Sequence, residues 1–362
     1  MLGVLIAAAG ILSTASATTA LAAPAAAVPW AKAGPGWAVV QYSTGTSPIG
    51  KPGKPGRLTL YLTSPQGKKY AIYTWKSSTG APGALVDWSG DRKRVLLDSQ
   101  KAYDAPVNIE QISLVTGKVI SKFKLPGDVF PIGYTKPDGL NLLAISDDGK
   151  LIRYDLHGHQ QLVLGSSKGA FSALYTPDGT SVFTTASKGL EEVSNDGGIV
   201  KRLPAAAPVF ACYPDRWWSA GTVLASCYVH RNSGRARLWL FDVATGRSTV
   251  LTPAAIPNSE EGAWRVGGKL YVQADAACQS IYQVYRNNSV HPVTVPGNPA
   301  VLMVDSFGAR LLLAGLPRCG YTGESLFWFN PATHALSYVF HPKGAATNGV
   351  IRIVPFGGTA TS

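Results

Sequence analysis

A strand-and-turn unit recurs seven times along the sequence. Each copy is an apolar strand that runs into a polar turn, as in LTLYLTSPQG, KLIRYDLHG and RLWLFDVATG. Successive copies lie between 39 and 50 residues apart when these turn positions are aligned: Gly67, Gly117, Gly158, Gly197, Gly246, Asn288 and Thr333. Repeats of this length that contain only short strands are typical of β-propellers. The repeat therefore predicts an all-β, seven-bladed β-propeller of four-stranded antiparallel blades.

The two chain ends are predicted to share one blade. After the last full repeat, the chain supplies one more strand, GVIRIVPFG, while its N-terminal part supplies three, within GWAVVQYS, LTLYLTS and KYAIYTW. A first blade built from both ends would close the ring and leave no exposed sheet edge. We therefore predict a propeller domain over 37–358, followed by a tail over 359–362.

The first residues have the pattern of an export signal. The apolar run MLGVLIAAAGIL is about as long as the core of a signal peptide and short for a membrane span. Ala20-Leu21-Ala22 fits the small-x-small rule for cleavage. We predict a signal peptide over 1–22, a linker over 23–36 and a secreted or extracytoplasmic protein without a transmembrane segment in the mature chain. An uncleaved anchor is the alternative.

The cysteines agree with export. There are four, an even number, as expected for two disulfides in an oxidising compartment. Cys212 and Cys227 fall on neighbouring strands of the predicted fifth blade, and Cys278 and Cys319 at the ends of second strands in the sixth and seventh. We predict the pairs Cys212–Cys227 and Cys278–Cys319, one of three possible connectivities. Zinc sites need closer spacing, and we predict no metal.

Two copies of the repeat contain the tripeptide Pro-Asp-Gly, at 137–139 and 177–179. Proline presets the first turn position and glycine accepts a positive φ, so the triplet predicts a hairpin between the first and second strands. Tyr213-Pro214-Asp215 is expected to form the equivalent turn of the fifth blade. Together with the apolar strand that follows and a strand ending in Asp, the triplet resembles the repeats of TolB-like propellers. The resemblance covers nearly all of the mature chain and implies the fold.

The sequence shows no catalytic constellation. Neither Gly-x-Ser-x-Gly nor His-Glu-x-x-His occurs. The run from Gly45 to Lys51 has the spacing of a phosphate-binding loop, but Pro52 follows where Ser or Thr should bind magnesium. His157 and His159 flank a turn without a third ligand nearby. We predict no cofactor and no catalytic residue. Acidic pairs occur at Asp147-Asp148, Glu191-Glu192 and Glu260-Glu261.

The charge distribution predicts a binding surface. The formal net charge is +12, and the loops expected to join second to third strands are rich in basic and aromatic residues. These candidate binding residues are Lys51, Lys54, Arg57, Lys101, Tyr103, His230, Arg231, Arg235, Arg318 and Tyr321. On the opposite face, Asp91, Asp138, Asp178, Asp196 and Asp215 are expected to offset local cations. The basic face would attract an anionic envelope polymer or an acidic protein surface, and nucleic acid is not an expected partner.

Three functional hypotheses remain open at this point. The first is an exported, non-catalytic binding or scaffold propeller that uses the basic loop face. The alternative is a glycan-active hydrolase or lyase with its site in the central funnel, where the innermost strands offer Asp87 and Asp305. A third is a structural module that docks a sister subunit, and basic loops that merely keep the protein soluble are also compatible with the sequence.

Overall fold

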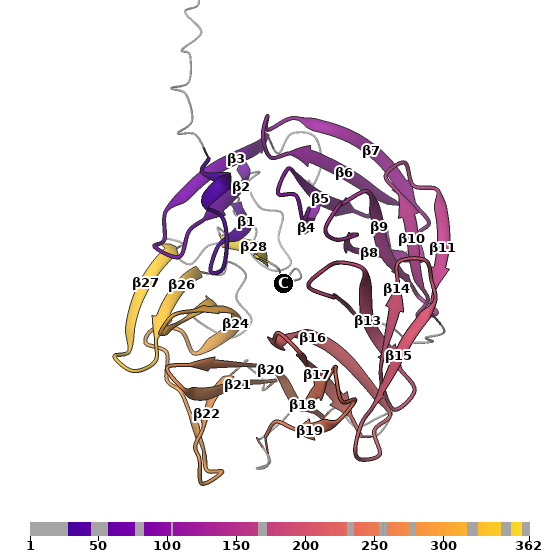
Figure 1. Ribbon diagram of the computed structural model, residues 1–362. Helices are drawn as coiled ribbons and strands as arrows, with labels where there is room; N and C mark the ends of the chain where they lie inside the picture. The colour runs from indigo at the N-terminus through magenta and orange to yellow at the C-terminus, as the bar shows by residue number, and fades with distance from the viewer. Residues whose placement is uncertain are drawn as a thin grey trace, which may run out of the picture.

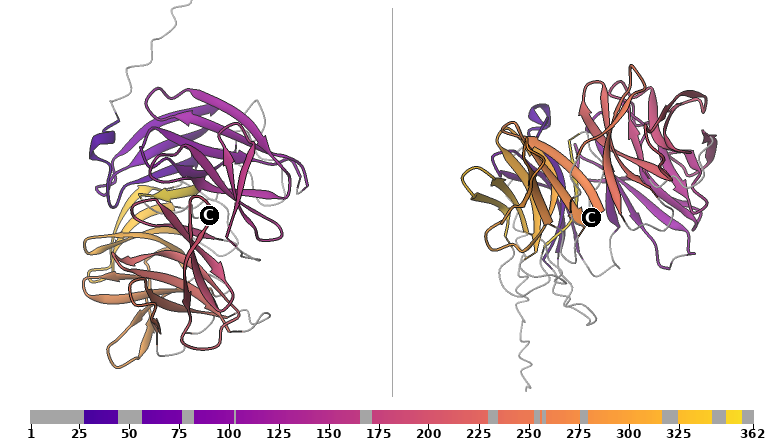
Figure 2. Two further views of the ribbon diagram at one scale, coloured as in Figure 1. Left: turned by 45° about the vertical axis from the view of Figure 1, so that its right-hand side comes forward. Right: turned by 90° about the horizontal axis from the view of Figure 1, so that it is seen from below.

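The computed structural model is a ring of seven blades around a central axis (Figure 1). It describes residues 28–44, 57–76, 83–102, 104–165, 172–229, 235–252, 256, 259–275, 280–316, 325–341 and 349–356. Every blade is a four-stranded antiparallel sheet, and Figure 2 shows the blades side by side around the ring. The predicted fold class, blade number and strand number are confirmed.

The first three blades are, from the axis outward, as follows. Blade 1 contains β28 (Gly349–Pro355), β1 (Ala38–Ser43), β2 (Arg57–Thr63) and β3 (Lys69–Lys76). Blade 2 contains β4 (Ala84–Trp88), β5 (Arg94–Ser99), β6 (Val107–Ser113) and β7 (Val119–Leu125). Blade 3 contains β8 (Val129–Tyr134), β9 (Asn141–Ser146), β10 (Leu151–Asp155) and β11 (Gln160–Leu164).

The other four blades follow the same order. Blade 4 contains β12 (Ala173–Tyr175), β13 (Ser181–Ala186), β14 (Gly189–Ser194) and β15 (Ile199–Pro204). Blade 5 contains β16 (Ala211–Ser219), β17 (Thr222–Tyr228), β18 (Ala236–Asp242) and β19 (Ser248–Val250). Blade 6 contains β20 (Ser259–Val266), β21 (Lys269–Asp275), β22 (Ser280–Val284) and β23 (Val290–Pro292). Blade 7 contains β24 (Ala300–Phe307), β25 (Arg310–Leu316), β26 (Ser325–Asn330) and β27 (Ala335–Phe340).

Blade 1 is composite, as predicted. The C-terminal strand β28 pairs antiparallel with β1, in a register that places Ala38 opposite Pro355 and Val40 opposite Ile353. It is the innermost strand of its blade, so the last described residues lie against the axis (Figure 1). The edge of β1 that faces the axis is therefore paired rather than open.

A separate hydrophobic core fills each of the seven interfaces between neighbouring blades. Because successive side chains of a strand point to opposite faces, one strand serves two cores. In β1, Val39 joins the core shared with blade 2, whereas Ala38 and Val40 join the core shared with blade 7. This alternation explains the apolar pattern of the repeat.

The aligned turn positions are left-handed in six of the seven repeats. Gly67, Gly117, Gly158, Gly197, Gly246 and Asn288 all have positive φ. In blade 7 the positive φ falls on His334, one residue after Thr333. The glycines of both Pro-Asp-Gly triplets, Gly139 and Gly179, also have positive φ, in the turns that leave β8 and β12. The glycine pattern thus reports a backbone requirement of the turns.

Six innermost strands contain a β-bulge that sequence analysis missed. The extra residues, which have no partner on the second strand, are Ile351, Val86, Ile132, Asp215, Trp218, Glu261 and Val304, two of them in β16. The expected turn at Tyr213-Pro214-Asp215 is wrong, because β16 continues through Asp215 to Ser219. The bulge leaves Asp215 without a partner on β17, while Pro214 and Arg216 on either side of it stay paired. It also places Asp215 in the axial channel instead of a surface turn.

One predicted disulfide is present. Cys212 on β16 and Cys227 on β17 lie directly opposite each other and are joined. Both sulfurs belong to the core between blades 4 and 5. Cys278 and Cys319 lie outside the described residues, as do residues 1–27. Within the predicted linker, a 3-10 turn η1 (Trp30–Lys32) leads to Ala33, which is buried against blades 1 and 2. In the described part of the chain, no helix is long and apolar enough to cross a membrane.

Candidate functional site

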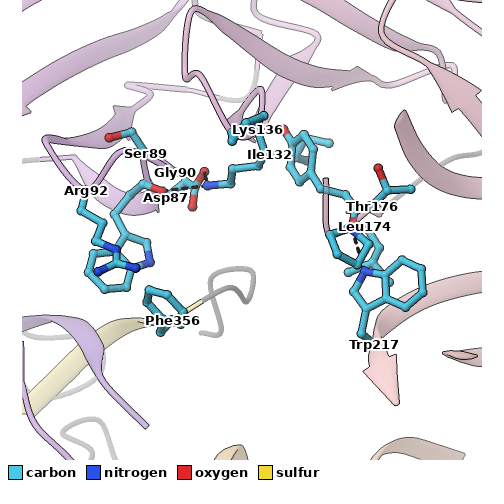
Figure 3. A pocket seen from close by; sticks show the side chains of 14 residues that line it. Asp87, Ser89, Gly90, Arg92, Ile132, Lys136, Leu174, Thr176, Trp217 and Phe356 are labelled. Atoms are coloured by element: carbon cyan, nitrogen blue, oxygen red, sulfur yellow. Dashed lines mark hydrogen bonds and ion pairs between the residues drawn. The ribbon is translucent and has the colours of Figure 1, made fainter. Parts of the chain in front are cut away.

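A cavity of about 450 Å³ opens at one end of the axial channel (Figure 3). It lies where β4, β8 and β12 end and turn toward their second strands, and Trp217 of β16 and Phe356, just after β28, complete its wall. We call it the mouth cavity, and the side of the ring on which it opens the turn face. Its size falls within the range of small-molecule sites, roughly 300–1,000 Å³.

An ion pair between blades 2 and 3 borders the mouth cavity. The Lys136 ammonium donates to Asp87 Oδ2 at 2.7 Å and to the Trp88 carbonyl oxygen at 2.7 Å. The backbone N–H of Tyr134 donates to the same carboxylate oxygen at 3.0 Å. Burial raises the pKa of Asp87, and Lys136 acts against that shift. The pair is therefore a fixed polar feature of the wall.

Aromatic side chains form much of the remaining wall. Figure 3 shows Trp217 and Phe356 on opposite sides of the opening. Trp217 is held by a hydrogen bond of 2.7 Å from its indole N–H to the Tyr175 carbonyl oxygen. Phe356 contacts the ring of Trp88 edge-on, with centroids 5.8 Å apart. The Tyr175 hydroxyl is buried and has no hydrogen-bond partner among the described residues. The cavity thus offers apolar ring faces and a few polar atoms.

Cations stacked on aromatic rings surround this end of the channel. The Arg92 guanidinium lies 4.8 Å from the ring centre of Phe356, and Lys136 lies 5.8 Å from that of Tyr175. Further pairs near first-to-second-strand turns are Arg94 with Tyr134, Arg216 with Trp264, Arg265 with Trp218, and Arg310 with Trp328. Such stacking holds the cations without neutralising them. Three of these cations also lie beside carboxylates, Lys136 at Asp87, Arg94 at Asp91 and Arg216 at Asp215 and Asp305, so the turn face combines aromatic rings with cations that are partly paired.

The three described candidates of the predicted basic loops lie on the other side of the ring. In an antiparallel blade, the second-to-third connections leave the edge opposite to the first-to-second turns. Arg57 begins β2, Lys101 follows β5 and Arg235 precedes β18, and all three are exposed. The other seven candidates lie outside the described residues: Lys51, Lys54, Tyr103, His230, Arg231, Arg318 and Tyr321. The structure thus places the described candidates at second-to-third connections, away from the mouth cavity.

A second cavity, of about 340 Å³, lies farther along the channel toward the face of the second-to-third connections, beside the first residues of β4 and β12. We call it the inner cavity. Residues of β28, β4, β8, β12 and β16 surround it, and its charged residues are Asp98, Asp215 and Arg352. Ile132 lines both cavities, so the two adjoin. Burial raises the pKa of Asp98, whereas the nearby Arg352 lowers it.

Asp215 and Asp305 share one cation. Arg216 interacts electrostatically with both carboxylates, while its guanidinium hydrogen-bonds the Ala263 carbonyl oxygen of blade 6. Burial raises the pKa of Asp215 to about 6, with Arg216 opposing the shift. Burial also raises the pKa of Asp305 to about 6. Sequence analysis named Asp305 and Asp87 as funnel acids, but they belong to separate pairs, and it missed Asp215 and Arg352.

The acidic pairs noted in the sequence have different environments. Glu191 is buried in β14, with Arg202 at 3.7 Å, and Glu260 is buried with hydrogen bonds from Thr252 and the Leu238 N–H. Asp148 lies in an exposed turn beside Lys150. Among the described residues, no group of three or more His, Cys, Asp or Glu side chains is arranged to hold a metal ion.

Comparison with known proteins shows the fold alone. No family model and no curated protein matches this sequence, so the resemblance to TolB-like propellers stays a resemblance. Solved structures with a similar fold include a prolyl endopeptidase, at a TM-score of 0.55 and 12% identity over 87% of this chain. This chain spans only 55% of that enzyme.

Two further structures cover most of both chains. The β-propeller domain of the Trilobed protease from Pyrococcus furiosus has a TM-score of 0.51 and 12% identity, and the match covers 84% of this chain and 99% of that one. An oligogalacturonate lyase in complex with manganese has a TM-score of 0.50 and 13% identity, over 85% of this chain and 86% of that one. The neighbours therefore include both a propeller domain of a protease and a lyase.

Proposed function

We propose that this chain is an exported binding propeller and that its ligand is an anionic glycan of the cell envelope. The observation that carries the proposal is the mouth cavity, where aromatic ring faces and cations occur together at the axis. The carbon-bound hydrogens of a sugar ring form an apolar face that packs on an aromatic ring. Trp217 and Phe356 offer such rings on two sides of the opening (Figure 3).

Charge supports an acidic rather than a neutral sugar. The protein has a formal net charge of +12, and Arg92 and Lys136 at the cavity outnumber Asp87. A positive surface raises the local concentration of an anionic ligand and speeds its arrival. Export is supported by the Cys212–Cys227 bridge, since disulfides persist mainly in oxidising compartments, and by the signal-like N-terminal sequence.

The binding test uses a galacturonate hexamer as an acidic probe and its methyl ester as a neutral one. We expect wild-type protein to bind the acidic hexamer more tightly than the ester. Phe356→Ala removes one wall and the support of Arg92, so we expect at least tenfold weaker binding, a loss of about 1.4 kcal/mol. Tyr285→Ala is the matched control, because Tyr285 is an exposed aromatic residue outside the cavity.

A loop variant separates the mouth cavity from the basic loop face. Neutralising Lys51, Lys54 and Arg57 to Gln should leave hexamer affinity within about twofold of wild type at physiological salt. Arg57, the described member of the three, is exposed at a second-to-third connection, and salt screens exposed charges over about 8 Å. If the loop variant loses binding while Phe356→Ala keeps it, the site is the loop face. If neither variant changes the affinity, the proposed glycan function is wrong.

A glycan-active hydrolase or lyase is the second candidate. The observation that favours it is the presence of two carboxyl groups, Asp215 and Asp305, whose pKa values are raised to about 6. Carboxyl groups with such values can act as general acids near neutral pH. Incubating the hexamer with the protein and counting new chain ends tests this. Chain cleavage by wild type that Asp215→Asn or Asp305→Asn abolishes would replace the binding proposal with an enzymatic one.

A further inference from the structure

The turn that leaves β4 has an arginine where the matching turns of blades 3 and 4 have glycine. Arg92 has a φ of 61°, in the left-handed region, and its N–H donates to the Ser89 carbonyl oxygen at 2.8 Å. In blade 4 the same place in the turn belongs to Gly179, whose N–H donates to the Thr176 carbonyl oxygen at 2.8 Å. This backbone conformation is unfavourable for a residue with a Cβ atom, so arginine here disfavours the fold relative to glycine.

The left-handed arginine differs in its position from the other residues of this kind. Three further described residues with a side chain have positive φ: Lys188, Asn288 and His334. They lie in second-to-third or third-to-fourth connections and are exposed. Arg92 is half-buried and lines the mouth cavity. Its unfavourable backbone therefore places a cation at the ligand site.

Two contacts hold the Arg92 guanidinium in place. Nη1 donates to the Ala33 carbonyl oxygen at 2.7 Å, and the group lies 4.8 Å from the ring centre of Phe356. Both supports are themselves fixed, because Ala33 is buried and the N–H of Phe356 donates to the Trp37 carbonyl oxygen at 2.8 Å. Arg92 and Phe356 lie on one side of the opening, opposite Trp217 (Figure 3). A cation that is held before the ligand arrives loses less entropy on binding.

Arg92 also has free hydrogen-bonding capacity. The other cation of the cavity, Lys136, donates to Asp87 at 2.7 Å, and the neighbouring Asp91 pairs with Arg94 at 3.9 Å. Arg92 has no acidic partner among the described residues. A guanidinium has five N–H donors, and only one of them has a hydrogen-bond partner in the described part of the chain. The remaining donors suit a carboxylate, which can accept two parallel hydrogen bonds from one guanidinium.

We propose that Arg92 is the residue that determines the charge specificity of the mouth cavity, and that it binds a carboxylate carried on the ring of the ligand. The guanidinium donates two hydrogen bonds to the carboxylate, while the apolar walls pack against the ring. This inference rests on the proposed function for the glycan itself. It adds that the bound sugar is a uronic acid and that Arg92, rather than Lys136, recognises its charge.

Two pairs of probes test this inference. One pair is the galacturonate hexamer and its methyl ester, and the other is cyclohexanecarboxylate and cyclohexanecarboxamide, which share a ring and differ in charge. Tryptophan fluorescence measures each affinity, since Trp88 and Trp217 line the cavity. Wild type should bind each acid about tenfold more tightly than its neutral partner, and Arg92→Gln should bind the two equally. Arg92→Gly should do the same, and the turn can accept it because Gly179 has the same place in blade 4.

Lys188→Gln is the matched control. Lys188 is an exposed cation with a φ of 66° that does not line the mouth cavity, and its replacement removes the same charge. This variant should prefer the acids as strongly as wild type does. An unchanged preference in Arg92→Gln and Arg92→Gly would overturn the inference, although binding of the hexamer would leave the glycan function standing.

The small probes separate the two proposals in the other direction. Binding of cyclohexanecarboxylate that depends on Arg92, without binding of the hexamer, would support the carboxylate site and make the glycan function wrong. Failure of wild type to bind either acid would overturn both.

Discussion

At the scale of single residues, Asp215 should make stability depend on pH. Its folded pKa is about 6, whereas an unfolded aspartate has a pKa of about 3.9. Between these values the folded state holds a proton that the unfolded state has released, so the free energy of unfolding should fall as pH rises from about 4 to about 6. Asp305 acts in the same direction.

Asp215→Asn should therefore be stabilising at pH 7.5. The variant cannot ionise, and Oδ2 loses no hydrogen bond within the described residues. We expect its free energy of unfolding to exceed that of wild type by about 1–2 kcal/mol, a value discounted because solvent in the channel partly screens the charge. Its free energy of unfolding should also decline less between pH 4 and 6, because one titrating carboxyl group has been removed. Urea unfolding at several pH values measures this.

Asp178→Asn has the opposite expected sign. Hydrogen bonds from Thr176 and Thr180 lower the pKa of Asp178, so its carboxylate stabilises the fold above pH 4. The Asn variant should be less stable than wild type at pH 7.5. A destabilised Asp215→Asn protein at that pH would contradict the raised pKa of Asp215.

At the scale of the element, the disulfide should stabilise the hairpin of β16 and β17. Cys212 and Cys227 are separated by 15 residues and are buried in the core between blades 4 and 5. In the chain-entropy account, a bridge that closes a loop of this length stabilises the folded state by about 3 kcal/mol, because it lowers the entropy of the unfolded chain. Cys212→Ala/Cys227→Ala should therefore have a free energy of unfolding about 3 kcal/mol lower than wild type, and its denaturant midpoint should be lower as well.

Two comparisons qualify the disulfide result. Cys278→Ala/Cys319→Ala is the control, because it leaves the bridge between β16 and β17 intact. Wild type that is unfolded, completely reduced and refolded should also have a lower unfolding midpoint, because reduction opens the buried Cys212–Cys227 bridge while the sulfur atoms still fill the core. An unchanged midpoint after complete reduction, confirmed by thiol labelling, would show that the bridge contributes nothing.

The elements also show which features the sequence can predict. Turns were predictable because Gly67, Gly139 and Gly179 occupy φ values that other residues avoid. Bulges were not, because the extra residue can be of any type: Val86 and Ile132 are apolar, and Asp215 and Glu261 are acidic. The inner cavity was missed for this reason. Pro214-Asp215 resembled the start of a Pro-Asp-Gly turn, although no glycine follows it and strand residues continue to Ser219.

At the scale of the whole molecule, the ring was predictable from the number of strands at each chain end. Three strands before the second blade and one after the seventh can complete one four-stranded sheet, and β28 does so. The mouth cavity was not predictable, because Trp88, Lys136, Trp217 and Phe356 come from four blades and meet only when the ring closes. The mouth cavity is therefore a property of the closed ring.

Ring closure by β28 should be essential for folding as a monomer. Val350, Ile353 and Val354 are buried in the two cores that blade 1 shares with its neighbours. Removing residues 349–362 exposes these cores and the hydrogen-bonding edge of β1, with an expected loss of more than about 4 kcal/mol, since burial of one such side chain is worth about 1.5–3 kcal/mol.

The truncated protein should aggregate or lose its cooperative thermal transition, whereas removal of 357–362 should leave both the transition and the elution volume unchanged. A synthetic peptide of residues 349–356 should restore the transition when added in trans, because it can pair with β1 as the native strand does. A monomer that lacks 349–362 and melts at the wild-type temperature would show that the ring closes without β28. In that case the contacts of the other six blades, and not the composite blade, would hold the propeller together.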